Sequence, residues 1–286
     1  MKQNHRLRYM KTIKTLFLLC ITLCFATSCK KEIDMTLMQK TVLQNADIHQ
    51  IEVSDAWDVT VVADSNTYVE LEYSAYVETY LNATMEGTKL EIGFTGSVHP
   101  AINSVYRAIL HTNKMERIKA ENASSINFTG VFEGTQLTVE LSDASICSGP
   151  VFTGQYCEIE IDDASKLLDF HFDGPFSQVT LRKASQFNGQ IHAREALHIT
   201  LEDNSRFVNK GGSTTQADII AKHACLLNMA KTQVHEMHVE VSEASEATVW
   251  VNALLKGTLT EASTLFYRGD AEIDVACSDD SQLIPF

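Results

Sequence analysis

The sequence predicts an all-β protein, a right-handed parallel β-helix with coils of about 20 residues and a strand-rich N-terminal cap. Two observations predict this fold. A short motif recurs nine times at a nearly constant spacing, and apolar residues alternate with polar ones beside it. The 286 residues are 44% hydrophobic, which is enough for one or two globular domains and too apolar for a disordered chain.

The N-terminus predicts export. Residues 1–28 carry five lysines and arginines and no acidic residue, and they run into an apolar segment at 16–25. That segment is about half as long as a membrane-spanning helix. Small residues at 26–28 precede Cys29. This pattern resembles a bacterial lipobox and implies that cleavage leaves Cys29 as a lipid-modified N-terminus, with residues 29–45 as a tether. The alternative is an ordinary secretory signal with an incidental cysteine.

The charge of the chain limits its partners. The formal net charge is −14, from 23 Lys and Arg against 37 Asp and Glu. Removal of residues 1–28 leaves 23 − 5 = 18 positive charges, so the mature chain carries 18 − 37 = −19. This balance argues against electrostatic binding of nucleic acid. We expect an acidic outer-membrane lipoprotein of the cell envelope, facing the periplasm or the surface, which binds the membrane through its lipid.

Four of the seven cysteines remain once the signal peptide and the lipidation position are set aside, namely Cys147, Cys157, Cys225 and Cys277. They show no CxxC spacing and no grouping with histidines of the kind that binds zinc. We therefore expect free, buried thiols, and no metal or other cofactor.

The strongest signal is an internal repeat. A tripeptide that is most often an acidic residue, alanine and serine recurs with steps of 21, 20, 20, 20, 20, 20, 18 and 18 residues. Its copies are Asn122-Ala123-Ser124, Asp143-Ala144-Ser145, Asp163-Ala164-Ser165, Lys183-Ala184-Ser185, Asp203-Asn204-Ser205, His223-Ala224-Cys225, Glu243-Ala244-Ser245, Glu261-Ala262-Ser263 and Asp279-Asp280-Ser281.

The residues before each copy predict a strand. The positions five and three residues before the middle of the motif are mostly apolar, and those between are mostly polar, which is the period of a strand. A unit of 20 residues cannot bury its own apolar face, so the coils must stack, with about 4.8 Å between neighbours. We expect the β-helix over residues 105–286, with Val139, Ile159, Val179 and Ile199 on adjacent rungs, right-handed by the crossover rule.

Weaker copies extend upstream. Residues 51–57, 68–73 and 89–94 look like further alternating strands, with a turn at Glu86-Gly87 and a loop at 95–104. We assign residues 46–104 to early coils or to a strand-rich cap. A cap is required because the first coil would otherwise expose an unpaired edge and an open core.

These residues resemble a known family. The repeats at 142–145 and 242–245 are similar to the Ser-Gly-Ala-Ser motif of the putative autotransporter adhesin, head-GIN domain family, and residues 53–59 with 68–71 resemble its opening strands. The resemblance covers about residues 46–286. It implies an exported, often lipid-anchored β-helical protein of the Bacteroidota type and, through the family's name, surface adhesion. The family usually has Gly at the corner where this chain has larger residues.

The corner column is the best candidate for chemistry. Stacking in register would align Asp143, Asp163, Asp203, Glu243, Glu261 and Asp279 along one edge. A cation such as Ca²⁺ could relieve their repulsion. The alternative is a row of solvated corner residues, in which Lys183 and His223 interrupt the like charges.

Other polar constellations are weaker. His235 and His238 are expected to be surface residues and not a metal pair, and His192, His198 and His223 are expected to form no column. The serine of each motif forms a ladder that we interpret as architecture, because a nucleophile needs a positioned base and oxyanion donors.

The function predicted from these features is a non-catalytic binding or adhesion module for glycans, other surface polymers or surface proteins. One alternative is a polysaccharide-active enzyme, whose residues would come from the aperiodic segment at 97–116, with Tyr106, Arg107, His111 and Lys114. Coils of 18 to 21 residues leave little length for a cleft. The other alternative is a purely structural envelope protein. Pairing along a flat face into a homo-oligomer is also compatible with a solenoid.

Overall fold

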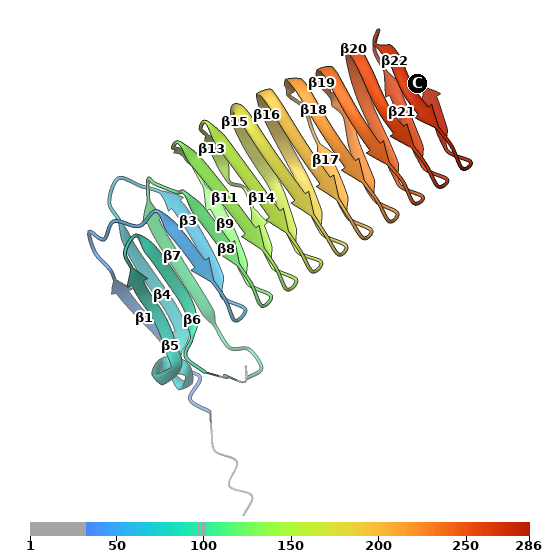
Figure 1. The fold of residues 1–286 in the computed structure, drawn as a ribbon. Coiled ribbons are helices and arrows are strands. Elements are labelled where there is room, and N and C mark those ends of the chain that lie inside the picture. Colours follow the sequence, from blue (N-terminus) through green and yellow to red (C-terminus); the bar gives the residue numbers. More distant parts are fainter. Residues whose placement is uncertain (1–32, 97, 99–100) are drawn as a thin grey trace, which may run out of the picture. The chain divides into compact units, whose positions relative to one another are not determined.

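The computed structural model describes residues 33–96, 98 and 101–286 (Figure 1). The predicted signal peptide and Cys29 lie outside the described residues. The chain divides into two units, Met1–Met35 and Thr36–Phe286, and the fold below is that of the second unit.

This unit is almost entirely β-structure, with one short 3₁₀ helix, η1, over Ala75–Tyr80. The strands of the N-terminal part are β1 (Leu37–Val42), β2 (Gln50–Val53), β3 (Asp58–Ala63), β4 (Tyr68–Ser74), β5 (Leu81–Glu86), β6 (Lys89–Phe94) and β7 (Tyr106–Thr112). The strands of the regular coils are β8 (Arg117–Ala120), β9 (Ser125–Thr129), β10 (Val131–Glu133), β11 (Gln136–Leu141), β12 (Ile146–Ser148), β13 (Val151–Thr153), β14 (Tyr156–Ile161), β15 (Lys166–Leu181), β16 (Gln186–Leu201), β17 (Arg206–Asn209), β18 (Ser213–Ala221), β19 (Leu226–Val241), β20 (Glu246–Leu259), β21 (Thr264–Arg268), β22 (Glu272–Cys277) and β23 (Gln282–Pro285).

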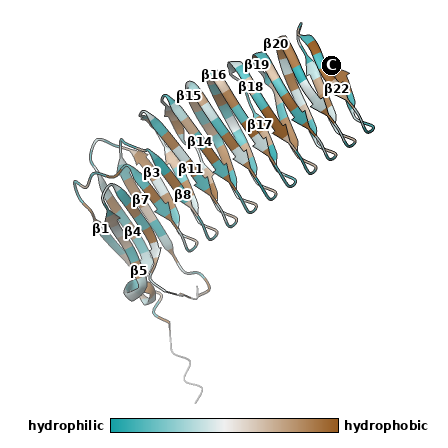
Figure 2. Ribbon diagram, viewed as in Figure 1, coloured by the Kyte–Doolittle hydropathy of each residue, from teal (hydrophilic) through white to brown (hydrophobic). Residues whose placement is uncertain are grey.

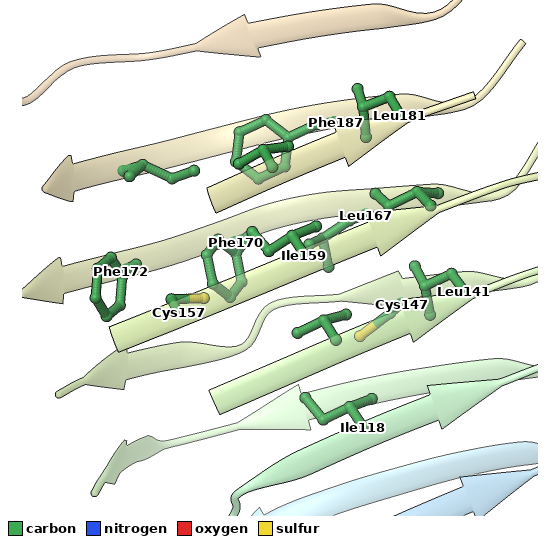
Figure 3. Close-up of a cluster of buried hydrophobic side chains, with 14 of the residues drawn as sticks. Ile118, Leu141, Cys147, Cys157, Ile159, Leu167, Phe170, Phe172, Leu181 and Phe187 are labelled. Atoms are coloured by element: carbon green, nitrogen blue, oxygen red, sulfur yellow. The ribbon is translucent and has the colours of Figure 1, made fainter. Parts of the chain in front are cut away.

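Successive coils pair in parallel and in register. Val139 is the partner of Ile159, Ile159 of Val179, and Val179 of Ile199. All four side chains are buried, and Figure 3 shows part of the core that they help to form. Hydrophilic and hydrophobic residues alternate along the strands (Figure 2), as the period of two requires. The predicted parallel β-helix is therefore confirmed.

Aromatic side chains fill the wider part of the core. The rings of Phe187 and Phe207 stack across neighbouring coils, with centroids 4.7 Å apart, and Phe152 stacks on Phe172 at 6.3 Å. Phe170 meets Phe187 edge to face at 6.0 Å. Such pairs contribute beyond the area they bury, by about 0.5–1.5 kcal/mol each.

Each corner motif bends the backbone through two consecutive left-handed residues. Asp143 and Ala144 have φ values of 55° and 61°, and the Ala144 N–H donates a hydrogen bond of 2.9 Å to the Asp163 carbonyl of the next coil. Lys183 and Glu243 adopt the same conformation, although side chains beyond Gly, Asn and Asp are disfavoured there. The hydrogen-bonded stack of corners therefore holds residues that carry a local backbone penalty.

The serine of each motif points inward. In several coils its hydroxyl donates a hydrogen bond to a backbone carbonyl oxygen at the start of the corner. The hydroxyl of Ser185 donates to the Arg182 carbonyl at 2.6 Å, and Ser205 does the same to Glu202 at 2.7 Å. Cys225 occupies the serine position in one coil, and its thiol contacts the Lys222 carbonyl at 3.0 Å. These side chains are buried in the core, so the serine ladder is part of the architecture and is not a row of nucleophiles.

The N-terminal strands do not stack in chain order. Strand β2 lies between β6 and β8, and β3 lies between β7 and β9, all in parallel. The coil of residues 50–63 is thus inserted between residues 89–112 and the coil that begins at β8. Beyond it, β4 pairs antiparallel with β7, β1 with β4, and β5 with β6 through a turn at Gly87. Antiparallel strands therefore cover the edges of the first parallel coil.

The last coils are two residues shorter than the others. The register between β19 and β20 shifts between Asn228 and Gln233 and again near Val234. Further along β20, Gly257 has a φ of 140° and is the register partner of Val239 on β19. A Cβ atom at Gly257 would lie 1.9 Å from the Val239 carbonyl oxygen. Only glycine allows this close backbone approach, so Gly257 replaces the aliphatic residue of the inward column.

The cysteines are free among the described residues, in three buried positions and one exposed. Cys147, Cys157 and Cys225 lie in the core, and burial raises the pKa of the first two thiols well above the usual range. The expectation that all four thiols are buried is wrong for Cys277. Cys277 occupies an inward column position on β22, next to Leu259 of β20. Among the described residues β22 pairs only with β20, so no further coil covers the Cys277 side chain and it is exposed.

We expect Ala164→Val to destabilise the protein by about 1–2 kcal/mol, because a β-branched residue at a φ of 61° clashes with its own backbone. Thr200→Val, at an outward position in β16, is the control and should change the free energy of unfolding by less. Urea unfolding monitored by circular dichroism measures both. Equal stability of the two variants would contradict the role of the left-handed corner.

We expect iodoacetamide to modify Cys277 in the folded state and to spare Cys147, Cys157 and Cys225 until the protein is unfolded. A form that begins at Thr36 isolates these four thiols, and intact mass measurement counts the adducts. Burial keeps the three core thiols protonated and inaccessible. Fast labelling of a second thiol under native conditions would show that the core opens.

Candidate functional site

Two of the outer sheet faces of the β-helix differ in chemistry. We call the first the acidic face, formed by two outward columns that run from β11 to β22. Six of its sixteen positions are acidic. The columns are Thr138, Glu158, Gln178, His198, Asp218, His238, Lys256 and Asp274, and Glu140, Glu160, Thr180, Thr200, Ile220, Glu240, Thr258 and Ala276.

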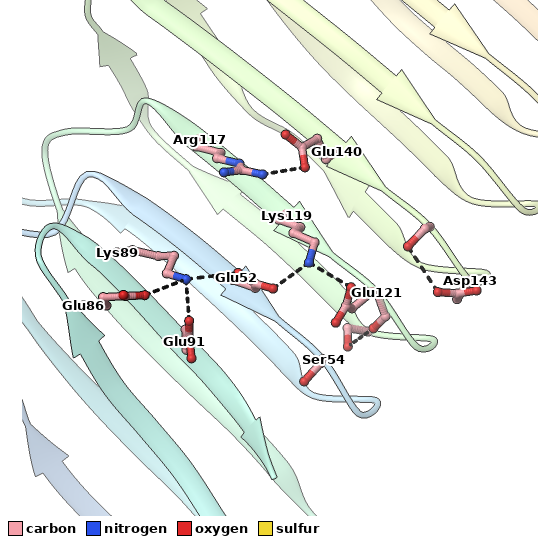
Figure 4. A network of polar contacts seen from close by, with 12 residues as sticks. Glu52, Ser54, Glu86, Lys89, Glu91, Arg117, Lys119, Glu121, Glu140 and Asp143 are labelled. Atoms are coloured by element: carbon pink, nitrogen blue, oxygen red, sulfur yellow. Dashed lines mark hydrogen bonds and ion pairs between the residues drawn. The ribbon is translucent and has the colours of Figure 1, made fainter. Parts of the chain in front are cut away.

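Upstream of the acidic face, on β6, β2 and β8, the same columns form a network of ion pairs (Figure 4). The ammonium group of Lys119 lies 2.6 Å from Glu52 and 3.0 Å from Glu121. Burial by itself would lower the pKa of Lys119. The hydrogen bonds to the two carboxylates raise it by more, so the pKa of Lys119 lies above its ordinary value. Arg117 reaches Glu140 at 2.7 Å. These contacts join neighbouring coils, so this part of the face is a charge ladder that supports stacking.

Two histidines of the acidic face do share a column. His198 and His238 flank Asp218 on consecutive coils, with Nδ1 to Oδ distances of 3.1 Å and 3.9 Å. His192, His198 and His223 themselves lie in three different columns, as expected, whereas the shared column of His198 and His238 was not expected. Their common position, six residues before the motif's middle residue, was the sequence signal for this column. Within the described residues, no group of three or more His, Cys, Asp or Glu side chains is arranged to hold a metal ion.

The structure aligns the corner column as the repeat predicts, and part of it is paired internally. Lys183 lies 3.1 Å from Asp163. His223 lies 3.2 Å from Asp203 through Nδ1 and 2.6 Å from Glu243 through Nε2. The other predicted residues behave differently: Asp143 and Asp279 accept hydrogen bonds from the serine that precedes each, and Glu261 has no ion pair among the described residues. Cation binding by this column remains a prediction.

The second outer face carries almost no acidic residues. We call it the amide face, formed by the outward columns of the sheet that runs from β9 to β23. Among its eighteen positions are five carboxamides, four hydroxyls, six apolar residues, two cations and one carboxylate. The columns are Ser125, Ile146, Lys166, Gln186, Arg206, Leu226, Glu246, Thr264 and Gln282, and Asn127, Ser148, Leu168, Asn188, Val208, Asn228, Thr248, Phe266 and Ile284.

This composition suits an extended polar ligand. Carboxamides donate and accept hydrogen bonds, and apolar side chains between them provide contact area. At the C-terminal end of the sheet, the Arg268 guanidinium lies 4.2 Å from the centre of the Trp250 ring and 5.9 Å from that of Phe286. At its N-terminal end, strands β1, β4, β7 and β3 line a hollow of about 320 Å³. The face thus runs between a hollow and an aromatic cluster.

The residues of the predicted enzyme alternative do not converge. Arg107 pairs with Glu72 at 3.4 Å, and Lys114 pairs with Asp47 at 2.9 Å. His111 pairs with Asp64 and stacks on Tyr68, while Tyr106 is buried and hydrogen-bonded to Tyr76. Each group has its own partner, so these four residues do not form one catalytic cluster.

One contact between a hydroxyl and a base lies elsewhere. The Ser213 hydroxyl is 3.1 Å from Nε2 of His192, whose Nδ1 is 3.5 Å from a carboxylate oxygen of Asp173. That oxygen forms a short contact with Arg194, which competes with the orientation of the histidine. The group lies on an outer strand surface, and sequence reasoning missed it because its members come from three coils and from no motif position.

The stacked parallel coils and the antiparallel strands at their N-terminal end define a capped β-solenoid. The chain belongs to the family described as putative auto-transporter adhesin, head GIN domain, whose model matches residues 47–271. This confirms the resemblance seen in the sequence. The family's description supports an adhesion-type, non-enzymatic and exported protein.

Solved structures share the fold. A putative adhesin from Parabacteroides merdae ATCC 43184 is 12% identical, with a TM-score of 0.67 over 88% of this chain and 96% of that one. A putative adhesin from Parabacteroides distasonis ATCC 8503 is 13% identical, with a TM-score of 0.65 over 89% and 98%. A protein of the latter organism described as a putative lipid binding protein is 12% identical, with a TM-score of 0.62 over 88% and 97%. No curated protein matches the sequence.

The part of the chain that the structure describes contains no helix with the length and apolar character needed to cross a membrane.

We expect millimolar CaCl₂ to leave the melting temperature unchanged, because Lys183 and His223 occupy two positions of the corner column and already contact Asp163, Asp203 and Glu243. Differential scanning fluorimetry across a calcium titration tests this. A specific site would raise the melting temperature by mass action. A rise that Glu261→Gln abolishes would instead establish the corner as a cation site.

Proposed function

We propose that this protein is a non-catalytic adhesion module of the cell envelope, held to the membrane by a lipid on Cys29, which binds extended surface polymers such as glycans along the amide face. The observation that carries the proposal is the composition of that face. It holds one carboxylate in eighteen positions, against six in sixteen on the acidic face, in a chain with a net charge of −14.

The geometry of a β-helix supports binding of this kind. Equivalent side chains recur at about 4.8 Å along the stack, so a polymer that lies along it meets the same type of contact repeatedly. Individually weak hydrogen bonds then add through multivalency. The sheet is held from behind by a packed core, which limits the conformational entropy lost on binding.

We expect Gln186→Ala with Asn228→Ala to weaken polymer binding several-fold, since each lost hydrogen bond is worth about 1 kcal/mol. Gln178→Ala with Thr200→Ala on the acidic face is the matched control and should bind like the wild type. A glycan array identifies the ligand, and biolayer interferometry compares the variants. Binding that is affected equally by both double variants would locate the site away from the amide face.

We expect Cys29→Ala to move the protein from the membrane fraction to the soluble fraction of the native host. Lipidation requires the thiol, so the variant cannot carry the lipid anchor. Metabolic labelling with an alkyne fatty acid provides the second measurement. If the variant stays in the membrane fraction and the wild type takes no label, the segment is an ordinary secretory signal.

The contact of Ser213 with His192 is the observation that favours the enzyme alternative. A reducing-end assay on the polymers that the protein binds, together with an activated-ester substrate, tests for turnover. Turnover that Ser213→Ala removes, with binding retained, would establish a hydrolase in place of a pure binding module.

A further inference from the structure

Two cations of the amide face have no internal partner. Within the described residues, neither Lys166 nor Arg206 takes part in an ion pair, although Arg182, Lys183, Arg194, Lys210 and Lys222 on the same coils each pair with a carboxylate. In a chain with 37 acidic residues against 23 basic ones, a carboxylate partner would be easy to place. These two charges therefore stay available to a ligand.

The surrounding coils are the least acidic part of the molecule. Residues 166–231 hold 8 basic and 6 acidic residues, so their net charge is 8 − 6 = +2. Residues 36–165 carry 6 − 19 = −13, and residues 232–286 carry 2 − 10 = −8. An anionic ligand is thus repelled by both ends of the β-helix and attracted to its middle coils.

Lys166 and Arg206 occupy one column, two rungs apart. Lys166 is the register partner of Gln186, and Gln186 is the partner of Arg206. Two rungs correspond to about 9.6 Å along the stack. Gln186 lies between the cations, and Asn188 stands beside it in the second column. Ile146 and Leu226, which are 39% and 44% exposed, end the row on either side.

We infer that the middle of the amide face binds an acidic polysaccharide, with carboxylate or sulfate groups at Lys166 and Arg206 and sugar hydroxyls at the carboxamides between them. This rests on the proposed polymer-binding function and specifies its ligand class. Arg206 presents a planar fork of donors that matches a carboxylate, and Lys166 presents a point charge. Gln186 supplies donors and acceptors for hydroxyl groups, and Asn188 supplies amide donors, because its Oδ1 atom is buried.

The same features argue against a nucleic acid. A duplex or single strand has a charge on every nucleotide, and its binding requires a long basic surface or stacking aromatics. Here the basic stretch is limited to two rungs, and no aromatic residue lies in this part of the two columns. A sparsely charged acidic glycan fits this spacing better.

The test uses polymers matched in everything except charge. The probes are polygalacturonate, alginate and hyaluronate, each compared with its carboxyl-reduced form, and vesicles of phosphatidylglycerol with phosphatidylcholine. Affinity electrophoresis and interferometry on the full mature chain measure binding. We expect at least one acidic polymer to bind about tenfold more tightly than its reduced form, a difference of roughly 1.4 kcal/mol, and the preference to fall with salt.

The variants separate this inference from the proposed function. Lys166→Ala with Arg206→Ala should abolish the preference for the acidic form, so that the acidic and reduced forms bind the variant equally. Lys166→Arg with Arg206→Lys should retain most of the preference. Lys256→Ala is the matched control, because Lys256 is an exposed cation on the acidic face that forms no ion pair within the described part of the chain.

The outcomes are distinct. Equal binding of acidic and reduced polymers, or a preference that survives the double alanine variant, overturns the inference and leaves polymer binding intact. Binding to the anionic vesicles alone, lost in the double variant, overturns it in favour of a lipid headgroup. Failure of every polymer and vesicle to bind overturns both the inference and the proposed function.

Discussion

The whole structure depends on the in-register pairing of parallel coils. Because each rung repeats the position of the one before, an inward aliphatic residue always meets another, as the column through Val139, Ile159 and Val179 shows. The same constraint acts on polar groups. Backbone hydrogen bonds between corners run from Ala144 to Asp163 and onward along the stack, which lets unfavourable left-handed residues persist at every turn.

Stacking in register also sets the chemistry of the outer faces. A like charge in the same column of every coil would repel its neighbours at about 4.8 Å. On the strands upstream of the acidic face, interleaved cations relieve this repulsion, as in the contacts of Lys119 with Glu52 and Glu121. The amide face has almost no carboxylates, and its carboxamide Gln186, between the two cations, forms no side-chain hydrogen bond within the described residues and can bond to a ligand. The two unpaired cations at Lys166 and Arg206 are conspicuous against that neutral background.

The outermost strands of a β-helix have no neighbouring coil on one side, and the two ends of this molecule differ in what covers them. At the N-terminal end, β4 and β5 pair antiparallel with β7 and β6 and cover the edges of these first parallel strands, and β1 pairs with β4 beyond them. At the other end, β22 pairs with β20 on one side only, and the inward position of Cys277 is exposed there. The column position of a residue therefore predicts its burial only where a further coil lies over it.

The sequence by itself determined the coil length, the inward and outward columns, the corner positions and the family, because each repeats locally at a fixed step. The same repeat length also predicts the amide face and the column that His198 shares with His238. These become visible only when the equivalent outward positions of successive coils are compared with one another. The tertiary structure alone decided that residues 50–63 insert between the strands β6 and β7 and the coil formed by β8 and β9, and that Ser213, His192 and Asp173 meet. These arrangements depend on pairing between segments far apart in the chain, and no local pattern specifies which segment becomes the neighbour of which.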